Sequence, residues 1–448
     1  MRKLKTKKQL ILYGCSGLGV NMMNIIVGSY LCSALLVGGF VDNVASWTYL
    51  NRDLVLAGLW AVLVFIAKAL DGIIDLPFAT FADSLKTKLG RRRTAILMGF
   101  IPMTVSYLLF LIPLNKEATL LNTIWFGVLL CIFYSAYTLT MLTYYATFSE
   151  VTETERETLF LSNTKSICDV VYFSLGFALV PLFVSLGINV RIVALIFLPL
   201  ALSMMIPFIL LKEDPEDQGE IRTLTLKTAL VTSFGNRSFI IWMFTTSVTN
   251  IGLQLFLGGI NEIFSSTGLN MTFVMAAAFA PVPATIIVYN KLVKRLGLAF
   301  GYRYVLSIYS VGMLVMFLCC ILADKMSMTA MTVFAICGAL FISFSIGAFF
   351  SITYTVPSSL ARRELEKSGK SVSSMYFAVQ GLFEGIAAGI ATGFILVTLK
   401  ANDVIHLLPV LAIVACAVSF GISFAFPKEI KELGKKGAET EESLPETV

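Results

Sequence analysis

Lys86-Thr-Lys-Leu-Gly-Arg-Arg-Arg93 separates two long apolar segments, and a similar stretch, Lys291-Leu-Val-Lys-Arg-Leu-Gly297, separates two others. The Leu-Gly pairs of the two stretches are 207 residues apart. The charged stretch 150–165 is likewise echoed by 358–370 at a similar distance. Charged loops that recur at one spacing between apolar segments predict a chain built from two similar halves.

The composition around these loops indicates that lipid is the solvent of the chain. Apolar residues make up 57% of its 448 residues and charged residues only 14%, whereas an ordinary globular domain has about 25% charged residues. So few charges cannot cover a surface in contact with water. The net charge of +6 could suggest nucleic acid as a partner, but the positions of the basic residues argue against that interpretation.

Twelve segments are long and apolar enough to span a membrane as helices, which takes roughly 20 residues each. The first apolar run, from Leu10 to about Phe40, is too long for the hydrophobic core of a signal peptide, so we expect it to be retained as a helix. The expected spans are 9–37, 54–82, 94–114, 120–149, 166–187, 189–211, 238–262, 270–292, 302–322, 328–355, 372–398 and 404–426.

The distribution of Lys and Arg predicts the orientation of these helices. With the N-terminus inside the cell, 28 of the 34 basic residues fall on cytoplasmic segments and 5 on the outer side. Cytoplasmic loops are rich in Lys and Arg, so both termini are expected in the cytoplasm. The sequence thus predicts an all-α membrane protein with twelve transmembrane helices in two six-helix halves.

The same pattern predicts how the chain is divided. We expect six-helix halves at 1–211 and 238–427, a polar cytoplasmic linker at 212–237 and a charged, disordered cytoplasmic tail at 428–448. Two such halves with a charged central linker are typical of transporters that work by alternating access, with the solute site at the interface of the halves.

Three ionisable residues of the second expected helix are the strongest candidates for chemistry: Lys68, Asp71 and Asp75. Their spacing places them on one helical face, and buried charges in a membrane are costly enough to mark functional sites. Two carboxylates about one turn apart can hold Na⁺ or share a proton, and Lys68 can hold them in position. The alternative is a salt bridge that only locks this helix, which would not need the second carboxylate.

Amide, aromatic and acidic residues recur on four other expected helices. Such groups suit a polyhydroxylated solute, although they also form hydrogen bonds between membrane helices. They are Tyr13, Asn21 and Asn24 on the first helix, Tyr144 and Tyr145 on the fourth, Asn250, Gln254, Asn261 and Glu262 on the seventh, and Tyr376, Gln380 and Glu384 on the eleventh.

Signatures of soluble enzymes are missing from the sequence: it has no G-x-x-x-x-G-K-[ST], H-E-x-x-H or G-x-S-x-G motif. The single histidine, His406, lies at an outer helix end, which argues against a histidine proton relay. We therefore expect no enzyme activity and no cofactor. Transport would be driven by a gradient, with Na⁺ or H⁺ as the coupling ion.

Lys68-x-x-Asp71-x-x-x-Asp75, followed by Asp83 and Leu89-Gly-Arg-Arg-Arg93, resembles the helix 2 signature of the glycoside-pentoside-hexuronide:cation symporters. This family belongs to the major facilitator superfamily and includes the melibiose carrier. Weaker resemblances to it are Tyr13-Gly-x-x-Gly17-x-Gly19, Glu150-Val-Thr152 with Arg156, Asn236-Arg-Ser-Phe239 and Tyr376-x-x-x-Gln380.

The resemblance implies roles for particular residues. Asp71 and Asp75 would bind the cation (Na⁺, if sodium is coupled), and Asp71 would also lie close to the sugar. We expect the other solute contacts from Asn21, Tyr145, Gln380 and Glu384, and supporting or gating contacts from Lys68, Asp83, Arg91, Arg92 and Arg156. The sequence departs from the family at four positions. It has Asn21 where carriers of the family often have an Asp and Met141 where some have an acidic residue, it lacks the helix 11 lysine near Gly385, and the proline after the second Asp is displaced by one, to Pro77.

The predicted function is cation-coupled symport of a glycoside or a related polar solute. We expect a monomer in the plasma membrane, specifically a bacterial inner membrane, whose partners are a small solute and the lipid bilayer but not nucleic acid. One alternative is a carrier of lysolipids or other amphiphiles, whose cavity would have one wholly apolar wall. A receptor that does not transport is another alternative, and the paired carboxylates inside the membrane argue against it.

Overall fold

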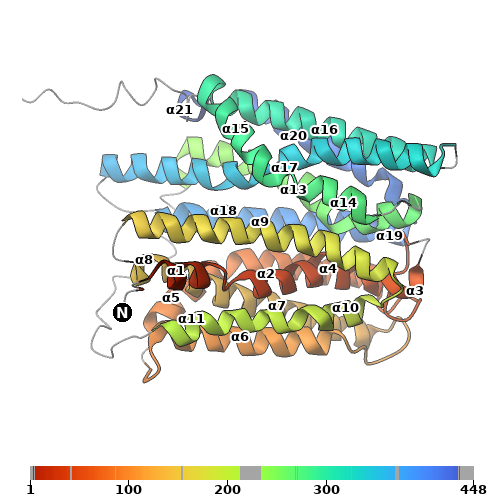
Figure 1. Cartoon of the computed structure of the whole chain (residues 1–448), viewed down its shortest axis with the longest axis horizontal. Coiled ribbons are helices and arrows are strands. Elements are labelled where there is room, and N and C mark those ends of the chain that lie inside the picture. Colours follow the sequence, from red (N-terminus) through yellow and green to blue (C-terminus); the bar gives the residue numbers. More distant parts are fainter. Residues whose placement is uncertain are drawn as a thin grey trace, which may run out of the picture.

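The computed structural model describes residues 4, 6–40, 43–85, 87–152, 155–211, 234–267, 269, 271–323, 325–368, 373–431 and 433. Every regular element in these ranges is a helix, and most helices run along one common direction (Figure 1). Most of the predicted linker, at 212–233, and most of the predicted tail, at 434–448, lie outside the described residues.

The helices that precede the linker form the lower layer of Figure 1. Their first span combines four pieces, of which the last is a short 3-10 helix (Ser33–Leu35), and their second and sixth spans are also interrupted. The elements are α1 (Lys7–Gly14), α2 (Leu18–Ile25), a π-helical stretch (Ile26–Leu31), α3 (Val44–Trp47), α4 (Ala57–Ile73), α5 (Asp75–Ser84), α6 (Arg91–Phe110), α7 (Leu120–Ala146), α8 (Phe148–Val151), α9 (Glu155–Ser185), α10 (Val190–Phe197) and α11 (Met205–Leu210).

The helices that follow the linker form the upper layer of Figure 1. The elements are α13 (Arg237–Thr267), α14 (Met271–Phe279), α15 (Val282–Leu296), α16 (Leu298–Leu322), α17 (Met328–Ser368), α18 (Ser373–Gly389), a second π-helical stretch (Ile390–Leu396), α19 (Val397–Ala401), α20 (Leu408–Ile422) and α21 (Lys428–Lys431). We refer to the two groups as the N-terminal half and the C-terminal half.

The fold predicted from the sequence is confirmed. Ten helices of the described residues are long and apolar enough to cross a membrane, and α4–α5 and α9 correspond to the two remaining predicted spans. Large apolar side chains cover the outside of the bundle: Ile101, Ile112 and Leu202 are all more than half exposed. A surface of this kind is stable against lipid chains and not against water.

Interruptions within the spans have local causes. Pro77 has no backbone N–H and its ring crowds the carbonyl of Ile73, and α4 ends at that residue. The first span breaks after Gly14, where the freed carbonyl groups find new donors. The Tyr144 hydroxyl donates to the Tyr13 carbonyl at 2.5 Å, and the Ser203 hydroxyl donates to the Ser16 carbonyl at 2.6 Å.

The two charged loops that introduced the repeat have the same local geometry. Gly90 and Gly297 directly precede α6 and α16, with φ values of 98° and 86° that favour glycine. A buttressing arginine follows each of them. Arg93 donates to the Phe208 carbonyl at 2.8 Å, and Arg303 donates to the Ser423 carbonyl at 3.0 Å. In each half, an arginine thus ties the third helix to the end of the sixth.

Close packing of the first and sixth spans yields a test of the fold. A Cβ atom at Gly19 would lie 1.8 Å from the carbonyl oxygen of Leu200, a backbone atom that cannot move aside by rotation. Gly19→Ala should therefore lower the free energy of unfolding by more than about 2 kcal/mol, measured as a lower midpoint of thermal unfolding in detergent. Gly58→Ala is the matched control because nothing lies within 4 Å of its Cβ position. Equal midpoints for the two variants would contradict this packing.

Candidate functional site

A cavity of about 890 Å³ lies between the two halves, and we call it the central cavity. Its volume falls in the range of small-molecule sites, about 300–1,000 Å³. Polar residues of both halves line it. They are Asn24, Lys68, Asp71, Asp75, Tyr137, Thr138, Tyr145, Lys165 and Asp169 from the N-terminal half, and Asn250, Gln254, Gln380 and Glu384 from the C-terminal half.

The three ionisable side chains of the second span all reach the central cavity, as their helical spacing predicts. Asp71 accepts a hydrogen bond from the Thr138 hydroxyl of α7. The Lys68 ammonium lies 3.9 Å from the centre of the Tyr134 ring, a cation–π contact. Asp75 opens α5, where the partial positive charge of a helix N-terminus favours a carboxylate.

Glycines bring this helix against α18 of the other half. A Cβ atom at Gly72 would lie 2.6 Å from the Gly381 carbonyl oxygen, and one at Gly385 would lie 2.8 Å from the Lys68 carbonyl oxygen. Small residues of this kind allow two membrane helices to approach closely. A Cβ atom at Gly381 would lie 3.0 Å from a carboxylate oxygen of Asp75. The carboxylate of one half therefore lies directly against the backbone of the other half.

A hydrogen-bonded chain on the C-terminal half faces these carboxylates. Trp242 of α13 donates to Gln380 at 3.3 Å, and Gln380 donates to the Glu384 carboxylate at 2.8 Å. Asn250 donates to the Glu384 backbone carbonyl at 3.0 Å. Gln380 and Glu384 are one turn apart on α18 and are held by α13, so both side chains have a fixed orientation at the cavity wall.

Lys165 and Asp169 on α9 form an ion pair at the central cavity that sequence reasoning missed. The Lys165 ammonium also lies 4.7 Å from the centre of the Tyr145 ring, and Asn21 donates to Asp169 at 3.4 Å. The signal in the sequence was the i, i+4 spacing of opposite charges on one helical face. It was overlooked because the stretch 150–165 was interpreted as a cytoplasmic loop, whereas α9 begins at Glu155.

Among the predicted solute contacts, Tyr145, Gln380, Glu384 and Asp71 line the central cavity, and Asn21 does not. Asn21 is 3% exposed and accepts a hydrogen bond from the Tyr137 hydroxyl at 2.8 Å. Asn21 thus lies behind the residues that line the cavity and positions two of them, Tyr137 and Asp169, by hydrogen bonds. One turn further along the helix, Asn24 lines the cavity in its place.

The predicted supporting residues occupy different places. Lys68 lines the cavity, whereas Arg91 and Arg92 lie in the first turn of α6, with Arg92 buried. The side chains of Asp83 and Arg156 lie outside the described residues, so their gating role stays a prediction. No group of three or more His, Cys, Asp or Glu side chains that could hold a metal ion is present in the part of the chain that the structure describes.

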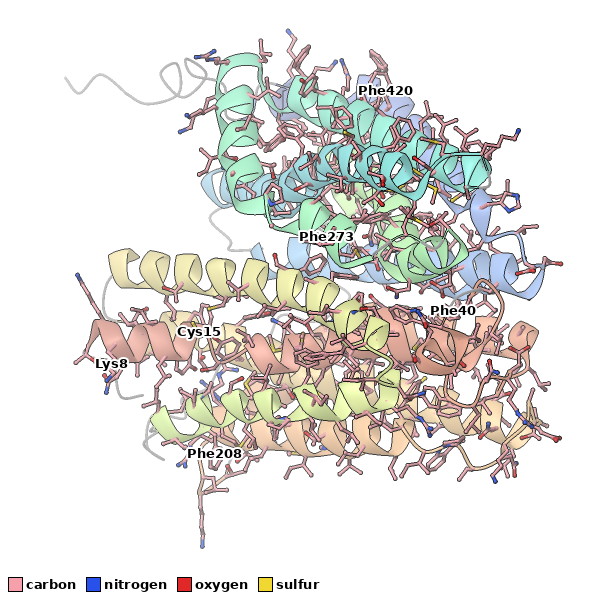
Figure 2. The ribbon with its side chains drawn as sticks, turned by 45° about the vertical axis from the view of Figure 1, so that its right-hand side comes forward. Lys8, Cys15, Phe40, Phe208, Phe273 and Phe420 are labelled. Carbon is pink, nitrogen blue, oxygen red and sulfur yellow. The ribbon has the colours of Figure 1, made fainter. Side chains whose placement is uncertain are left out.

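The halves meet at the end of the bundle that the Lys and Arg distribution predicts to lie on the outer side. Asn261 of α13 donates to the Ser29 carbonyl at 2.9 Å, and the rings of Phe177 and Phe279 stack with centroids 4.6 Å apart. Figure 2 shows Phe40, from the loop after the first span, at this boundary between the layers. The central cavity extends the other way, to Tyr145 near the end of α7 and Phe148 at the start of α8. The structure is therefore closed at one end, and its cavity is directed toward the opposite end, which the Lys and Arg distribution predicts to be cytoplasmic.

Comparison with known proteins places this geometry in a family. The family model described as MFS/sugar transport protein matches residues 12–416. No curated protein matches the sequence.

Solved structures share the fold. The crystal structure of the nucleoside transporter NupG aligns with a TM-score of 0.64 and 16% identity over 96% of this chain and 100% of that one. A POT family transporter in complex with a thioalcohol-conjugated peptide aligns with a TM-score of 0.62 and 12% identity, over 94% and 97% of the two chains. A bacterial homologue of the human lysosomal transporter Spinster, inward-facing and unoccupied, aligns with a TM-score of 0.60 and 12% identity, over 95% and 99%.

Proposed function

This chain belongs to the MFS/sugar transport protein family, and from that membership we propose that it is a cation-coupled symporter of a glycoside or a related polar solute. Within the superfamily, its second helix resembles that of the melibiose-carrier-like symporters. The observation that carries the proposal is the pair Asp71 and Asp75 in a polar cavity shared by both halves. Each carboxylate is costly to keep in a membrane, which favours a functional role for the pair.

The cation site of the proposal consists of Asp71 and Asp75. Their oxygens lie on either side of a break in the second span, beside the Thr138 hydroxyl and the backbone of α18. Hard oxygen ligands suit Na⁺, and the same carboxylates can instead accept a proton. Because Asp75 lies against Gly381, a cation bound here would act on both halves at once.

The solute site of the proposal consists of Asp71, Tyr145, Gln380 and Glu384, joined by Lys165 and Asp169. Carboxylates and amides on opposite walls can grip hydroxyl groups of one solute, and the Tyr145 ring offers a face on which a sugar ring stacks. Among the described residues, polar side chains line the cavity from both halves, whereas the cavity of an amphiphile carrier is expected to have one wholly apolar wall. The cavity thus favours a glycoside over a lysolipid.

Coupling follows from differential affinity for two conformations. A solute that contacts Asp71 and Tyr145 on one half and Gln380 and Glu384 on the other binds best when the halves close around it. A cation at Asp71 and Asp75 neutralises charge that would oppose this closure. Both ligands together therefore shift the population toward the closed state, from which either side can open.

The experiment that tests the proposal measures solute-evoked currents of the purified protein in proteoliposomes. The panel contains glycosides, uronides and lysolipids, each applied with Na⁺, without Na⁺ and at two pH values. A transient current for one polar solute, dependent on Na⁺ or on pH, would support symport and name both ligands. Currents for lysolipids alone would overturn the solute class, and folded protein that is silent to the whole panel would overturn the proposed function.

A further inference from the structure

Two buried charged residues, Lys400 and Glu262, lie at the closed end of the bundle and do not line the central cavity. Lys400, on α19, is 3% exposed, and Glu262, near the end of α13, is fully buried. Their side chains form an ion pair at 2.7 Å. The second carboxylate oxygen of Glu262 is buried and has no hydrogen-bond partner among the residues that the structure describes.

Both charges belong to the C-terminal half, and the N-terminal half supplies their remaining contacts. The Lys400 ammonium donates to the carbonyl and the hydroxyl oxygens of Ser33, both at 2.8 Å. The Ser33 hydroxyl in turn donates to Glu262. The ammonium also lies 4.5 Å from the centre of the Phe40 ring, which Figure 2 shows at the boundary between the halves.

The loop that carries Phe40 is shaped to cover this pair. A Cβ atom at Gly38 would lie 2.3 Å from the Lys400 carbonyl oxygen, and Gly39, at φ 85°, packs against the Glu262 side chain. Phe40 stacks on Trp47 of the short helix α3, with ring centroids 5.8 Å apart. The backbone of Gly38 and Gly39 therefore shields the two charged groups from water on the outer side.

We propose that Ser33, Glu262 and Lys400 form the outer gate of the transporter, which holds the outer end closed while the cavity faces the cytoplasm and parts when the outer end opens. Among the contacts of the ion pair, opening breaks those with Ser33 and Phe40 and removes the cover of Gly38 and Gly39. The ion pair stays whole on its own half and regains water, which offsets the cost of lost contacts.

A chamber of about 20 Å³ lies between the gate residues and Lys68 of the central cavity. Cys32, Ser33, Thr392 and both Lys68 and Lys400 line it, and Lys68 is the residue that it shares with the central cavity. A volume of this size is enough for about one water molecule. When the gate parts, the chamber becomes the outer mouth of the cavity, and the Cys32 thiol becomes reachable from outside.

The test is the labelling of Cys32 by a membrane-impermeant maleimide added outside right-side-out membrane vesicles, quantified by peptide mass spectrometry. Glu262→Gln leaves Lys400 buried without a neutralising charge, and Lys400→Met leaves Glu262 in the same state. Each single variant should destabilise the closed gate and raise the labelling rate of Cys32 at least about tenfold. The double variant Glu262→Gln/Lys400→Met buries no charge and should return labelling to the wild-type rate or below.

Cys320 on α16 serves as the internal control because it belongs to the C-terminal half and does not line the chamber at the gate. Its labelling should be equal in all four proteins. Unchanged Cys32 labelling in both single variants would overturn the gate. So would a double variant labelled as fast as the single variants, or Cys320 labelling that rises together with Cys32, because either result indicates general loosening. The inference uses alternating access but not the identity of solute or cation, so silence in the current assay leaves this result unaffected.

Discussion

Asp75→Asn is expected to abolish cation-driven accumulation of the solute in proteoliposomes. The amide keeps the size of the side chain but removes the negative charge of the proposed cation site beside Gly381. Removing one partner of a buried charge interaction costs about 3–5 kcal/mol, so the apparent cation affinity should fall at least about 100-fold. Exchange of labelled for unlabelled solute across the membrane does not need the cation gradient and should persist.

The measurement for Asp75→Asn is solute uptake against cation concentration, with exchange of labelled for unlabelled solute as the second readout. Glu117→Gln is the matched control because it also replaces a carboxylate with an amide, at an exposed position outside the central cavity. If Asp75→Asn accumulated solute with the cation dependence of the wild type, the assignment of the cation site would be wrong.

Glu384→Gln should act on the solute instead of on the cation. A glutamine keeps the hydrogen bond from Gln380, which reaches Glu384 at 2.8 Å, and it keeps the length of the side chain. What it loses is the charge, and hydrogen bonds to charged groups contribute about 1.5–3 kcal/mol. The solute affinity should therefore fall about 10- to 100-fold, while the cation concentration that gives half-maximal transport changes less than about threefold.

The informative result is that the two variants should change the apparent affinity for different ligands. Asp75→Asn should raise the half-maximal cation concentration, and Glu384→Gln should raise the half-maximal solute concentration. A Glu384→Gln variant with unchanged solute affinity would remove this side chain from the solute site. If it instead lost all dependence on the cation, Glu384 would belong to the coupling site.

Residues of the second span show how far sequence alone could predict the site. Lys68, Asp71 and Asp75 follow a helical spacing, and buried charge in a membrane helix is rare enough to stand out. The structure brings all three to one cavity. The positions of the spans were equally predictable because hydropathy and the Lys and Arg distribution act along the chain and need no tertiary information.

Asn21 and Asn24 show where that reasoning stops. Both are amides on the first span, and the π-helical stretch that follows at Ile26–Leu31 leaves no mark in the composition. Helix rotation decides which amide meets the cavity, and rotation is set by packing against neighbouring helices. Asn24 lines the cavity, while Asn21 lies behind Tyr137 and Asp169.

Lys400 shows the limit of charge counting. At the end of an apolar span it counts as an ordinary outer-side residue, since long cationic side chains commonly reach from helix ends to the membrane surface. The structure instead buries it against Glu262 and Ser33. That partner set joins three helices distant in sequence, so only the assembled bundle reveals it.

Thermodynamic linkage between the two ligands tests the central claim most directly. Solute affinity is measured by calorimetry on the wild-type protein across a range of cation concentrations, and cation affinity across a range of solute concentrations. If Asp71 and Asp75 couple a cation to solute binding in one shared cavity, each ligand should raise the affinity of the other by the same factor, about 5-fold or more. Solute affinity that stays constant at every Na⁺ concentration and every pH would contradict the account.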